Sequence, residues 1–361
     1  MGYHYDINKA VRKLKTKTTL VIASLILGIS GLGVAIPLVA NASATCTPTG
    51  FYRDGINMTA ANINPTSTVT SNIDATGCNI GVYFGPGKNG SLNGATIHGS
   101  NYYGVVVQQA KVNVKDSNVY QIGETPLNGD QHGVGIYYAT VAGVTNGDCT
   151  TGSTKGTVDG NSVSSYQKAG IVVDCTGSNV TVENNIVQGQ GPVNYIAQNG
   201  IEIGVGANAK VTGNIVTGNS YTGAGGASSG AILVFGGPVY GGDYTTNTQV
   251  TDNIVIGNDV GVYASNLLSC SSTSCLPSTT KTHIAVEDNT IANAGLNNTT
   301  GNSSTQGYQA GVSDQGDGDT IANNKISGAG YNPANSSPSI AVFAIDITST
   351  NNVKIHAHSF H

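Results

Sequence analysis

Two carboxylates could carry out glycoside hydrolysis. Asp174 ends the segment G-I-V-V-D at 170–174, and Glu202 lies in G-I-E-I at 200–203. Hydrolysis needs one carboxyl to protonate the leaving oxygen and a second to attack or to activate water. If the two segments are neighbouring strands, both side chains leave one face of a sheet with an offset of two residues, and their Cα atoms lie on the order of 8 Å apart. The sequence therefore predicts this pair as the leading catalytic candidate. A pair of scattered, solvated acids is the alternative.

The elements that must position these acids are sequence repeats. The stretch 199–219, NGIEIGVGANAKVTGNIVTGN, contains one full unit: a G-I-x-I strand with alternating faces, a polar turn, and V-T-G-N-I-V. The second half of this unit recurs nine times between 69 and 326, at spacings of 22 to 44 residues. A period in this range is the signature of a solenoid whose repeats bury a continuous core only when stacked.

The fourth position of the recurring V-x-x-N-x-I segment is asparagine in seven of nine copies. Asparagine tolerates a tight bend, and its amide both donates and accepts hydrogen bonds. Stacked copies are therefore expected to form a ladder along the solenoid axis. The nine positions are Asn72, Ala95, Ser117, Asn161, Asn185, Asn214, Asn253, Asn289 and Asn324.

This ladder and the G-I-x-V strands resemble the right-handed parallel β-helix of the pectin lyase-like superfamily, over roughly residues 69–355. The resemblance implies an all-β fold, a single solenoid of about ten coils. It does not imply one activity, because such repeats occur in lyases, hydrolases, epimerases, adhesins and phage tailspikes. Polygalacturonase-like relatives place acids on consecutive coils of this sheet. Their N-T-D, D-D and R-I-K signatures are missing here, and only the H-G of G-D-Q-H-G is present, so Asp130 and His132 are the weaker catalytic candidates.

The N-terminal residues have the pattern of an export signal. Five basic residues precede an apolar run at 18–40, which is followed by A-S-A at 42–44. This order predicts a signal peptide over 1–44, cleaved after Ala44, and a β-helix domain over 45–361. The apolar run is also long enough to span a bilayer as an uncleaved anchor helix, which would be the only contact with a membrane. In both cases the remainder is expected to be extracellular or at the cell surface.

The exported part is acidic and contains all the cysteines. Without residues 1–44 the chain keeps 10 basic and 19 acidic residues, a net charge of −9, which is a poor match for nucleic acid or an anionic membrane. Six cysteines in an exported protein favour structural disulfides over a metal site, since no C-x-x-C spacing is present. The expected pairs are Cys46–Cys78, Cys149–Cys175 and Cys270–Cys275.

Insertions flank the G-I-x-V strands at both ends. They lie before the strand at 120–132, 188–198, 219–229, 294–309 and 329–339, and after it at 139–155, 236–248 and 265–282. Loops in these places would make the outer face of the strands the floor of a groove, which is where polysaccharide binds in the resembling enzymes. The expected floor residues are Val106, Tyr137 (or Gly135), Val172, Glu202, Ile232, Tyr263 and Ser313. Tyr137 and Tyr263 could stack on sugars; alternatively, loops bury this face.

The sequence also contains a candidate calcium-binding site. The D-Q-G-D-G-D run offers Asp314, Asp317 and Asp319 as hard oxygen ligands, although a polar turn also explains it. Pectate-lyase-like elimination would need such a cluster together with a basic residue near the floor. Arg53 is the only arginine of the exported part and precedes the first coil, which argues against elimination.

These observations support three functional hypotheses. The first is a secreted or cell-surface β-helix protein that binds, and in some form processes, extracellular polysaccharide. The second is a non-catalytic adhesion or surface-structural module, and the third is a glycoside hydrolase that uses Asp174 and Glu202. We expect a monomer whose partner is a polysaccharide or a cell-surface glycan, with no nucleic acid.

Overall fold

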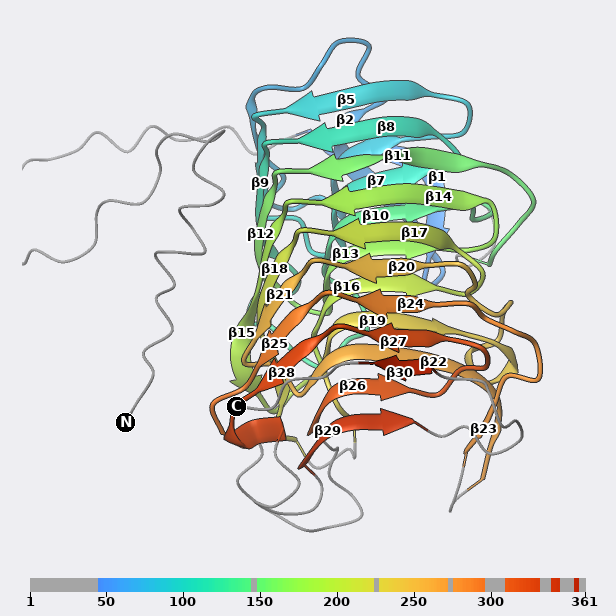
Figure 1. Cartoon of the computed structure of the whole chain (residues 1–361). Coiled ribbons are helices and arrows are strands. Elements are labelled where there is room, and N and C mark those ends of the chain that lie inside the picture. The colour runs from blue at the N-terminus through green and yellow to red at the C-terminus, as the bar shows by residue number, and fades with distance from the viewer. Residues whose placement is uncertain are drawn as a thin grey trace, which may run out of the picture. The chain divides into compact units, whose positions relative to one another are not determined.

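The short β-branched segments of the sequence form stacked strands. The computed structural model describes residues 45–143, 148–223, 227–271, 275–295, 309–331, 339–344 and 354–356. Within these residues the chain winds through three sheets in turn. Most coils contribute one strand to each sheet, and strands of successive coils pair in parallel (Figure 1). The predicted signal peptide at 1–44 lies outside the described residues.

The three sheets are named A, B and C. Sheet A contains β1 (Thr47–Arg53), β2 (Ile56–Ile63), β4 (Ile80–Phe84), β7 (Tyr103–Gln108), β10 (Val134–Ala139), β13 (Ala169–Asp174), β16 (Asn199–Gly204), β19 (Gly230–Gly236), β22 (Val260–Cys270), β26 (Gln309–Asp314) and β29 (Ser339–Ala344), with β23 (Cys275–Pro277) paired to β22. Sheet B contains β5 (Asn89–Asn93), β8 (Lys111–Lys115), β11 (Thr154–Asp159), β14 (Ser178–Glu183), β17 (Asn208–Thr212), β20 (Gln249–Thr251), β24 (Ala285–Glu287), β27 (Thr320–Ala322) and β30 (Lys354–His356). Sheet C contains β3 (Asn72–Asp74), β6 (Thr96–His98), β9 (Asn118–Ile122), β12 (Ser162–Tyr166), β15 (Ile186–Val193), β18 (Ile215–Tyr221), β21 (Ile254–Ile256), β25 (Thr290–Ala292) and β28 (Lys325–Ser327). Two short 3-10 helices, η1 (Pro238–Tyr240) and η2 (Ala329–Tyr331), complete the described elements.

The interior of the solenoid is a column of β-branched side chains. Register in sheet A stacks Val82, Val105, Ile136, Ile171, Ile201, Ile232, Val262 and Val312, all fully buried. Each such burial stabilises the fold by about 1.5–3 kcal/mol. The glycine before the column is sterically required: a Cβ on Gly135 would lie 2.6 Å from the carbonyl oxygen of Gly170 and 2.6 Å from Val163 Cγ1.

The predicted asparagine ladder is confirmed from Asn161 to Asn324. Each side-chain amide donates to the Oδ1 of the next, at 2.9–3.0 Å. Ser117 continues the column, since its backbone N–H donates to Asn161 Oδ1 at 3.0 Å. Asn72 was wrongly assigned to it: this residue pairs with Thr96 and is exposed, because the first coil is one residue shorter at the bend.

The outer side of sheet A differs from the prediction at one position. Tyr137 aligns with Val106, Val172 and Glu202, so Tyr137 and not Gly135 is the outer residue. In β19, however, Glu202 aligns with Leu233, and the expected Ile232 belongs to the interior column. Ala231 there takes the place of the motif glycine, which shifts the pattern by one residue.

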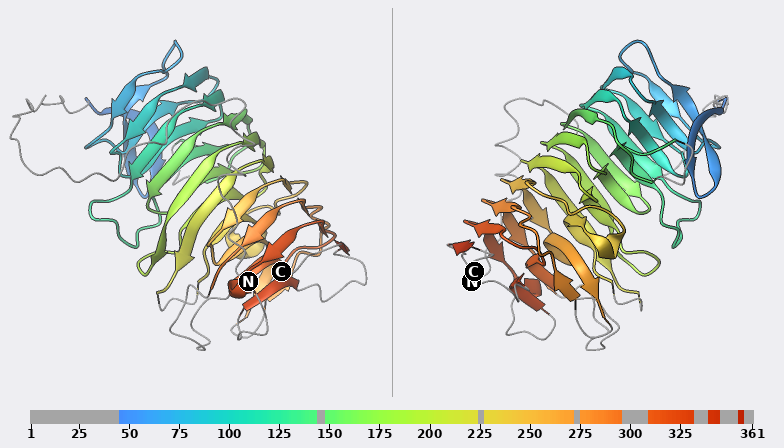
Figure 2. Two further views of the ribbon diagram at one scale, coloured as in Figure 1. Left: turned by 60° about the vertical axis from the view of Figure 1, so that its left-hand side comes forward. Right: turned by 90° about the vertical axis from the view of Figure 1, so that its right-hand side faces the viewer.

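A hairpin of β1 and β2 covers the first coils of sheet A. The two strands are antiparallel, and β1 lies alongside the first coils (Figure 2, right). The Phe51 ring stacks 6.3 Å from the ring of Tyr83 and lies 6.1 Å from that of Tyr103, while the Tyr52 N–H donates to Gly143 O at 2.9 Å. The hairpin and the outer residues of β4 to β13 form a second apolar cluster, separate from the interior.

All three predicted disulfides are present: Cys46–Cys78, Cys149–Cys175 and Cys270–Cys275. The first ties the hairpin's entry to the first coil, the second closes the loop after β10 onto the end of β13, and the third joins β22 to β23. The described part holds no helix long and apolar enough to cross a membrane.

Candidate functional site

Asp174 and Glu202 lie together on the outer face of sheet A, as the repeat register predicted. Val172 pairs with Glu202 and Asp174 with Gly204, so the acids stand on adjacent strands with an offset of two residues. Asp174 is half-buried, and Glu202 is 8% exposed. The sequence-derived geometry of the pair is therefore present in the fold.

The surroundings of Asp174 favour its protonated form. The Tyr137 hydroxyl donates a hydrogen bond to its carboxylate, and the Cys175 N–H donates to Oδ1 at 3.2 Å. Burial, followed by repulsion from Glu202, raises the pKa of Asp174 to about 6, while Arg53 and the two hydrogen bonds oppose that rise. Asp174 can therefore hold a proton in mildly acidic solution, as a general acid must.

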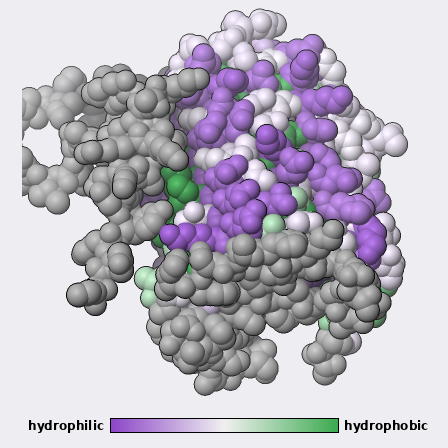
Figure 3. Space-filling view, in the orientation of Figure 1, coloured by the Kyte–Doolittle hydropathy of each residue, from purple (hydrophilic) through white to green (hydrophobic). Residues whose placement is uncertain are grey.

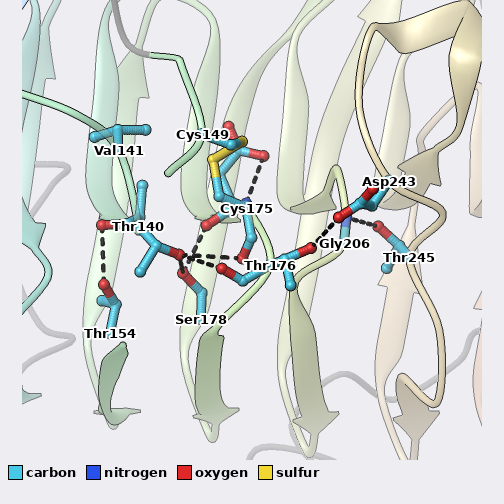
Figure 4. Close-up of a disulfide and its surroundings, with 12 residues drawn as sticks. Thr140, Val141, Cys149, Thr154, Cys175, Thr176, Ser178, Gly206, Asp243 and Thr245 are labelled. Atoms are coloured by element: carbon cyan, nitrogen blue, oxygen red, sulfur yellow. Dashed lines mark hydrogen bonds between the residues drawn. A yellow bond between two sulfur atoms is a disulfide. The ribbon is translucent and has the colours of Figure 1, made fainter. Parts of the chain in front are cut away.

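The turn after Asp174 is fixed by a disulfide and several hydroxyls (Figure 4). Ser178 Oγ donates to the carbonyl oxygen of Asp174 at 2.6 Å and lies 3.1 Å from Thr140 Oγ1. The Thr176 hydroxyl donates to Asp243 Oδ2 at 2.6 Å, which ties this turn to the loop after β19. The Cys149–Cys175 bridge closes the same corner, so the backbone that carries Asp174 is held from several sides.

Glu202 is oriented by one amide. The Asn199 Nδ2 group donates to Glu202 Oε1 at 2.6 Å, and Asn199 Oδ1 accepts from the Gly230 N–H at 2.7 Å. This chain of bonds links β16 to β19 and leaves the carboxyl in one defined position. Asn199 begins the repeat unit described above, but sequence spacing did not identify its contact with Glu202.

Arg53 is a site residue that the sequence did not reveal. It ends β1, and the hairpin brings it over sheet A instead of leaving it ahead of the first coil. Burial opposes its charge, yet Tyr103, Tyr137, Asp54 and Asp174 together raise the pKa of Arg53. The expectation that Arg53 stays ahead of the first coil, away from the floor, is therefore wrong. The hairpin lies outside the repeats, so no periodic signal marks its fold.

Aromatic side chains continue the site beyond the acids. A Cβ on Gly204 would lie 2.5 Å from Phe235 Cζ and 2.9 Å from Asp174 Oδ1, so this glycine leaves room for ring and carboxyl on either side. The rings of Phe235 and Tyr240 lie 5.1 Å apart, and the Tyr240 hydroxyl bonds Ser265 Oγ at 2.6 Å. Tyr240 is 39% exposed. Neither Phe235 nor Tyr240 was predicted from the sequence, because both follow the motif positions of their coil.

The two predicted sugar-stacking tyrosines are in different environments. Tyr263 is half-buried on β22, next to Leu233 in register. Tyr137 is only 4% exposed, because the hairpin covers it, and its hydroxyl donates a hydrogen bond to Asp174. Tyr137 therefore orients the acid and does not present a face for stacking, which corrects the prediction for that residue.

Asp130 and His132 lie apart from the acid pair, just before β10. The His132 ring stacks 3.9 Å from the ring of Tyr102, and its Nε2 lies 2.9 Å from Glu124 Oε1. Asp130 is exposed and accepts from Asn128 Nδ2 at 2.8 Å. The strand separates this group from Asp174, which ends the neighbouring β13, so the structure does not bring the four candidates together.

The predicted calcium ligands divide into two groups. Asp314 and Asp319 are buried neighbours, and Asp319 Oδ1 accepts from Thr282 Oγ1 at 2.6 Å and from the Ile284 N–H at 2.7 Å. Burial and then Asp314 raise the pKa of Asp319 well above its ordinary value. Asp317 instead pairs with Lys281 at 3.0 Å. Across the residues that the structure describes, no three His, Cys, Asp or Glu side chains are grouped to hold a metal ion.

Comparison with known proteins supports the fold. Residues 54–237 match the family described as right handed beta helix region. The searches of curated proteins and of solved structures gave no match. The matched segment runs from the hairpin turn to the end of β19 and so includes both candidate acids. Because it covers half of the sequence and the described coils follow the same architecture, the chain belongs to the right-handed β-helix family.

Proposed function

We propose that this is a secreted or cell-surface protein that binds polysaccharide on the outer face of sheet A. The binding surface, here called the acid–aromatic strip, consists of Asp174, Glu202, Phe235, Tyr240 and Tyr263. The observation that carries the proposal is the convergence of a fixed carboxyl pair with partly exposed aromatic rings just beyond the hairpin.

The chemistry of the strip suits sugars. Aromatic faces pack against the apolar faces of pyranose rings, and tyrosine adds a polar group at its tip. Carboxyl oxygens accept hydrogen bonds from sugar hydroxyls, and protonated Asp174 can also donate. The paired acids disfavour an anionic ligand at this place, so a neutral, hydroxyl-rich glycan is the expected class. The three disulfides agree with an extracellular location.

The test is binding by the purified protein to a panel of neutral glycans, followed by titration calorimetry on the best ligand. Tyr240→Ala should weaken binding by about tenfold, which corresponds to roughly 1.4 kcal/mol. Tyr120→Ala is the matched control, because Tyr120 is a half-buried tyrosine of β9 in sheet C, away from the strip. Absence of binding to any glycan, or equal loss in both variants, would contradict the proposal.

Glycoside hydrolysis is a second candidate, favoured by one observation. Asp174 has a pKa raised to about 6 and stands beside a second carboxyl, which fits a general acid next to a nucleophile or base. Asp174→Asn and Glu202→Gln should then each remove product formation while glycan binding persists. If neither substitution changes any measured function and no product forms, the protein is a binding or adhesion module.

A further inference from the structure

A basic hollow lies at the starts of three neighbouring strands of sheet B. It has a volume of about 160 Å³ and begins beside β5, β8 and β11, away from the acid–aromatic strip on sheet A. Its polar lining is Lys88, Asn89, Gln109, Lys111, Ser153 and Lys155. The outer surface over these strands is mostly hydrophilic (Figure 3).

The solenoid register stacks the charges of this hollow. In the backbone register, Asn89 of β5 pairs with Lys111 of β8, and Lys111 pairs with Lys155 of β11. Lys111 and Lys155 therefore lie on adjacent strands, whose backbones are about 4.8 Å apart. Lys88 comes directly before Asn89, and its carbonyl accepts from the Lys111 N–H at 2.9 Å. Lys111 and Lys155 thus stack along the solenoid axis, and Lys88 lies beside them, one residue out of register; the three exposed lysines are here called the lysine row.

No carboxylate lines the hollow. Within the described ranges, the ion pairs of lysines join Lys115 to Asp159 and Lys281 to Asp317, and neither includes a lysine of the row. The side chains of these exposed lysines are not ion-paired with a carboxylate of the hollow, so an anion placed among them would be attracted by all three. This arrangement occurs in a chain whose overall charge is −5, so it is a local exception to an acidic surface.

We propose that the hollow binds the carboxylate or sulfate groups of a linear acidic polysaccharide. A row of charges along the axis matches regularly spaced anionic groups better than one isolated ion. Nucleic acid is disfavoured because no aromatic side chain lines the hollow for base stacking. This site takes an anionic ligand, whereas the acid–aromatic strip takes a neutral one, so the two proposals stand independently.

The test measures binding of the full protein to dextran sulfate and polygalacturonate, with uncharged dextran, single-stranded DNA and inorganic phosphate as comparison probes. Wild type should bind an acidic polysaccharide, with affinity that falls as salt rises, whereas any binding to dextran should be unaffected by salt and by the lysine substitutions. Lys111→Gln with Lys155→Gln should weaken binding by about tenfold. The matched control is Lys210→Gln with Lys325→Gln, which removes the same charge from exposed positions of β17 and β28.

Four outcomes would overturn this proposal: no binding to either acidic polysaccharide, equal loss in the two double variants, tighter binding to the DNA, or binding of phosphate alone. Circular dichroism checks that both double variants keep the wild-type β signal. Because the Tyr240→Ala variant retains all three lysines, failure of glycan binding on sheet A would be distinguished from failure here.

Discussion

The outer face of sheet A has two regions with different surroundings. Over β4 to β13, its outer residues form an apolar cluster sealed by the β1–β2 hairpin. Over β16 to β26, the equivalent positions carry Glu202, Leu233, Tyr263 and Ser313, and none belongs to that apolar cluster. The same strand alternation thus produces a second apolar cluster in one region. In the other, here called the open region because it lies outside that cluster, Leu233 and Tyr263 are half-buried while Glu202 and Ser313 are buried.

This difference locates the candidate site at the boundary between the regions. Asp174 ends the last strand of the covered region, and Glu202, itself buried, lies on the first strand of the open one. The covered region supplies Tyr137 and Arg53, which act on the Asp174 carboxyl from a buried side. The open region supplies the rings of Phe235 and Tyr240. The boundary therefore places a shielded carboxyl beside partly exposed aromatic rings.

The largest expected effect comes from unsealing the covered region. Phe51→Ala removes a fully buried ring that contacts Tyr83 and Tyr103 and should destabilise the protein by about 3–5 kcal/mol. Tyr240→Ala, in the open region, should change stability by less than about 1 kcal/mol. Urea unfolding of both variants measures the contrast. Similar losses in the two variants would mean that the regions do not differ as described.

Replacing one asparagine of the ladder should lower stability by a smaller amount, and by the same amount in both regions, because the ladder runs through both. Asn161 donates to Val114 O at 2.9 Å and accepts from the Ser117 N–H at 3.0 Å. Asn289 makes the equivalent bonds to Val250 O and from Asn253 N–H, at 2.9 and 3.0 Å. Alanine at either position leaves buried backbone groups unpaired and should cost about 2–3 kcal/mol. A marked difference between the two urea midpoints would show that the hairpin, and not the ladder, stabilises the first coils.

The ladder could be predicted from sequence because it is periodic. Every coil repeats the same bend, so one asparagine predicts the place of the next, and the offset of Asp174 from Glu202 follows from the same count. Errors arose where a coil departs from the repeat. A shorter bend excluded Asn72 from the ladder, and Ala231 in place of the motif glycine turned Ile232 inward.

The burial of the outer face of sheet A over β4 to β13 could not be predicted, because it depends on the β1–β2 hairpin, which precedes the repeats. Nothing in T-P-T-G-F-Y-R-D-G-I-N-M specifies that Phe51 lies on Tyr83, or that Arg53 reaches the acid at the end of β13. Tyr137 was therefore expected to bind a ligand and is buried. The alternation of a strand shows which side a residue faces, whereas tertiary contacts decide what covers that side.

The smallest effect concerns the acid at the boundary. Because the pKa of Asp174 is raised to about 6 in the folded protein, the folded state holds this proton more tightly than the unfolded chain does. Its contribution to stability is present below the unfolded pKa of about 4 and is lost as pH rises to about 6. Asp174 is partly exposed, so solvent screening reduces the expected loss to about 1–2 kcal/mol.

Asp174→Asn should remove this part of the pH dependence. The variant is expected to resemble wild type at pH 4 and to be the more stable protein at pH 7, by about 1–2 kcal/mol, in urea titrations at both pH values. Glu183→Gln serves as the control, because Glu183 is a half-buried carboxyl on sheet B, away from this face. If the stability of the Asp174→Asn variant falls between pH 4 and pH 6 as steeply as that of wild type, Asp174 does not hold its proton more tightly in the fold. The covered region would then not shield the Asp174 carboxyl from solvent as described.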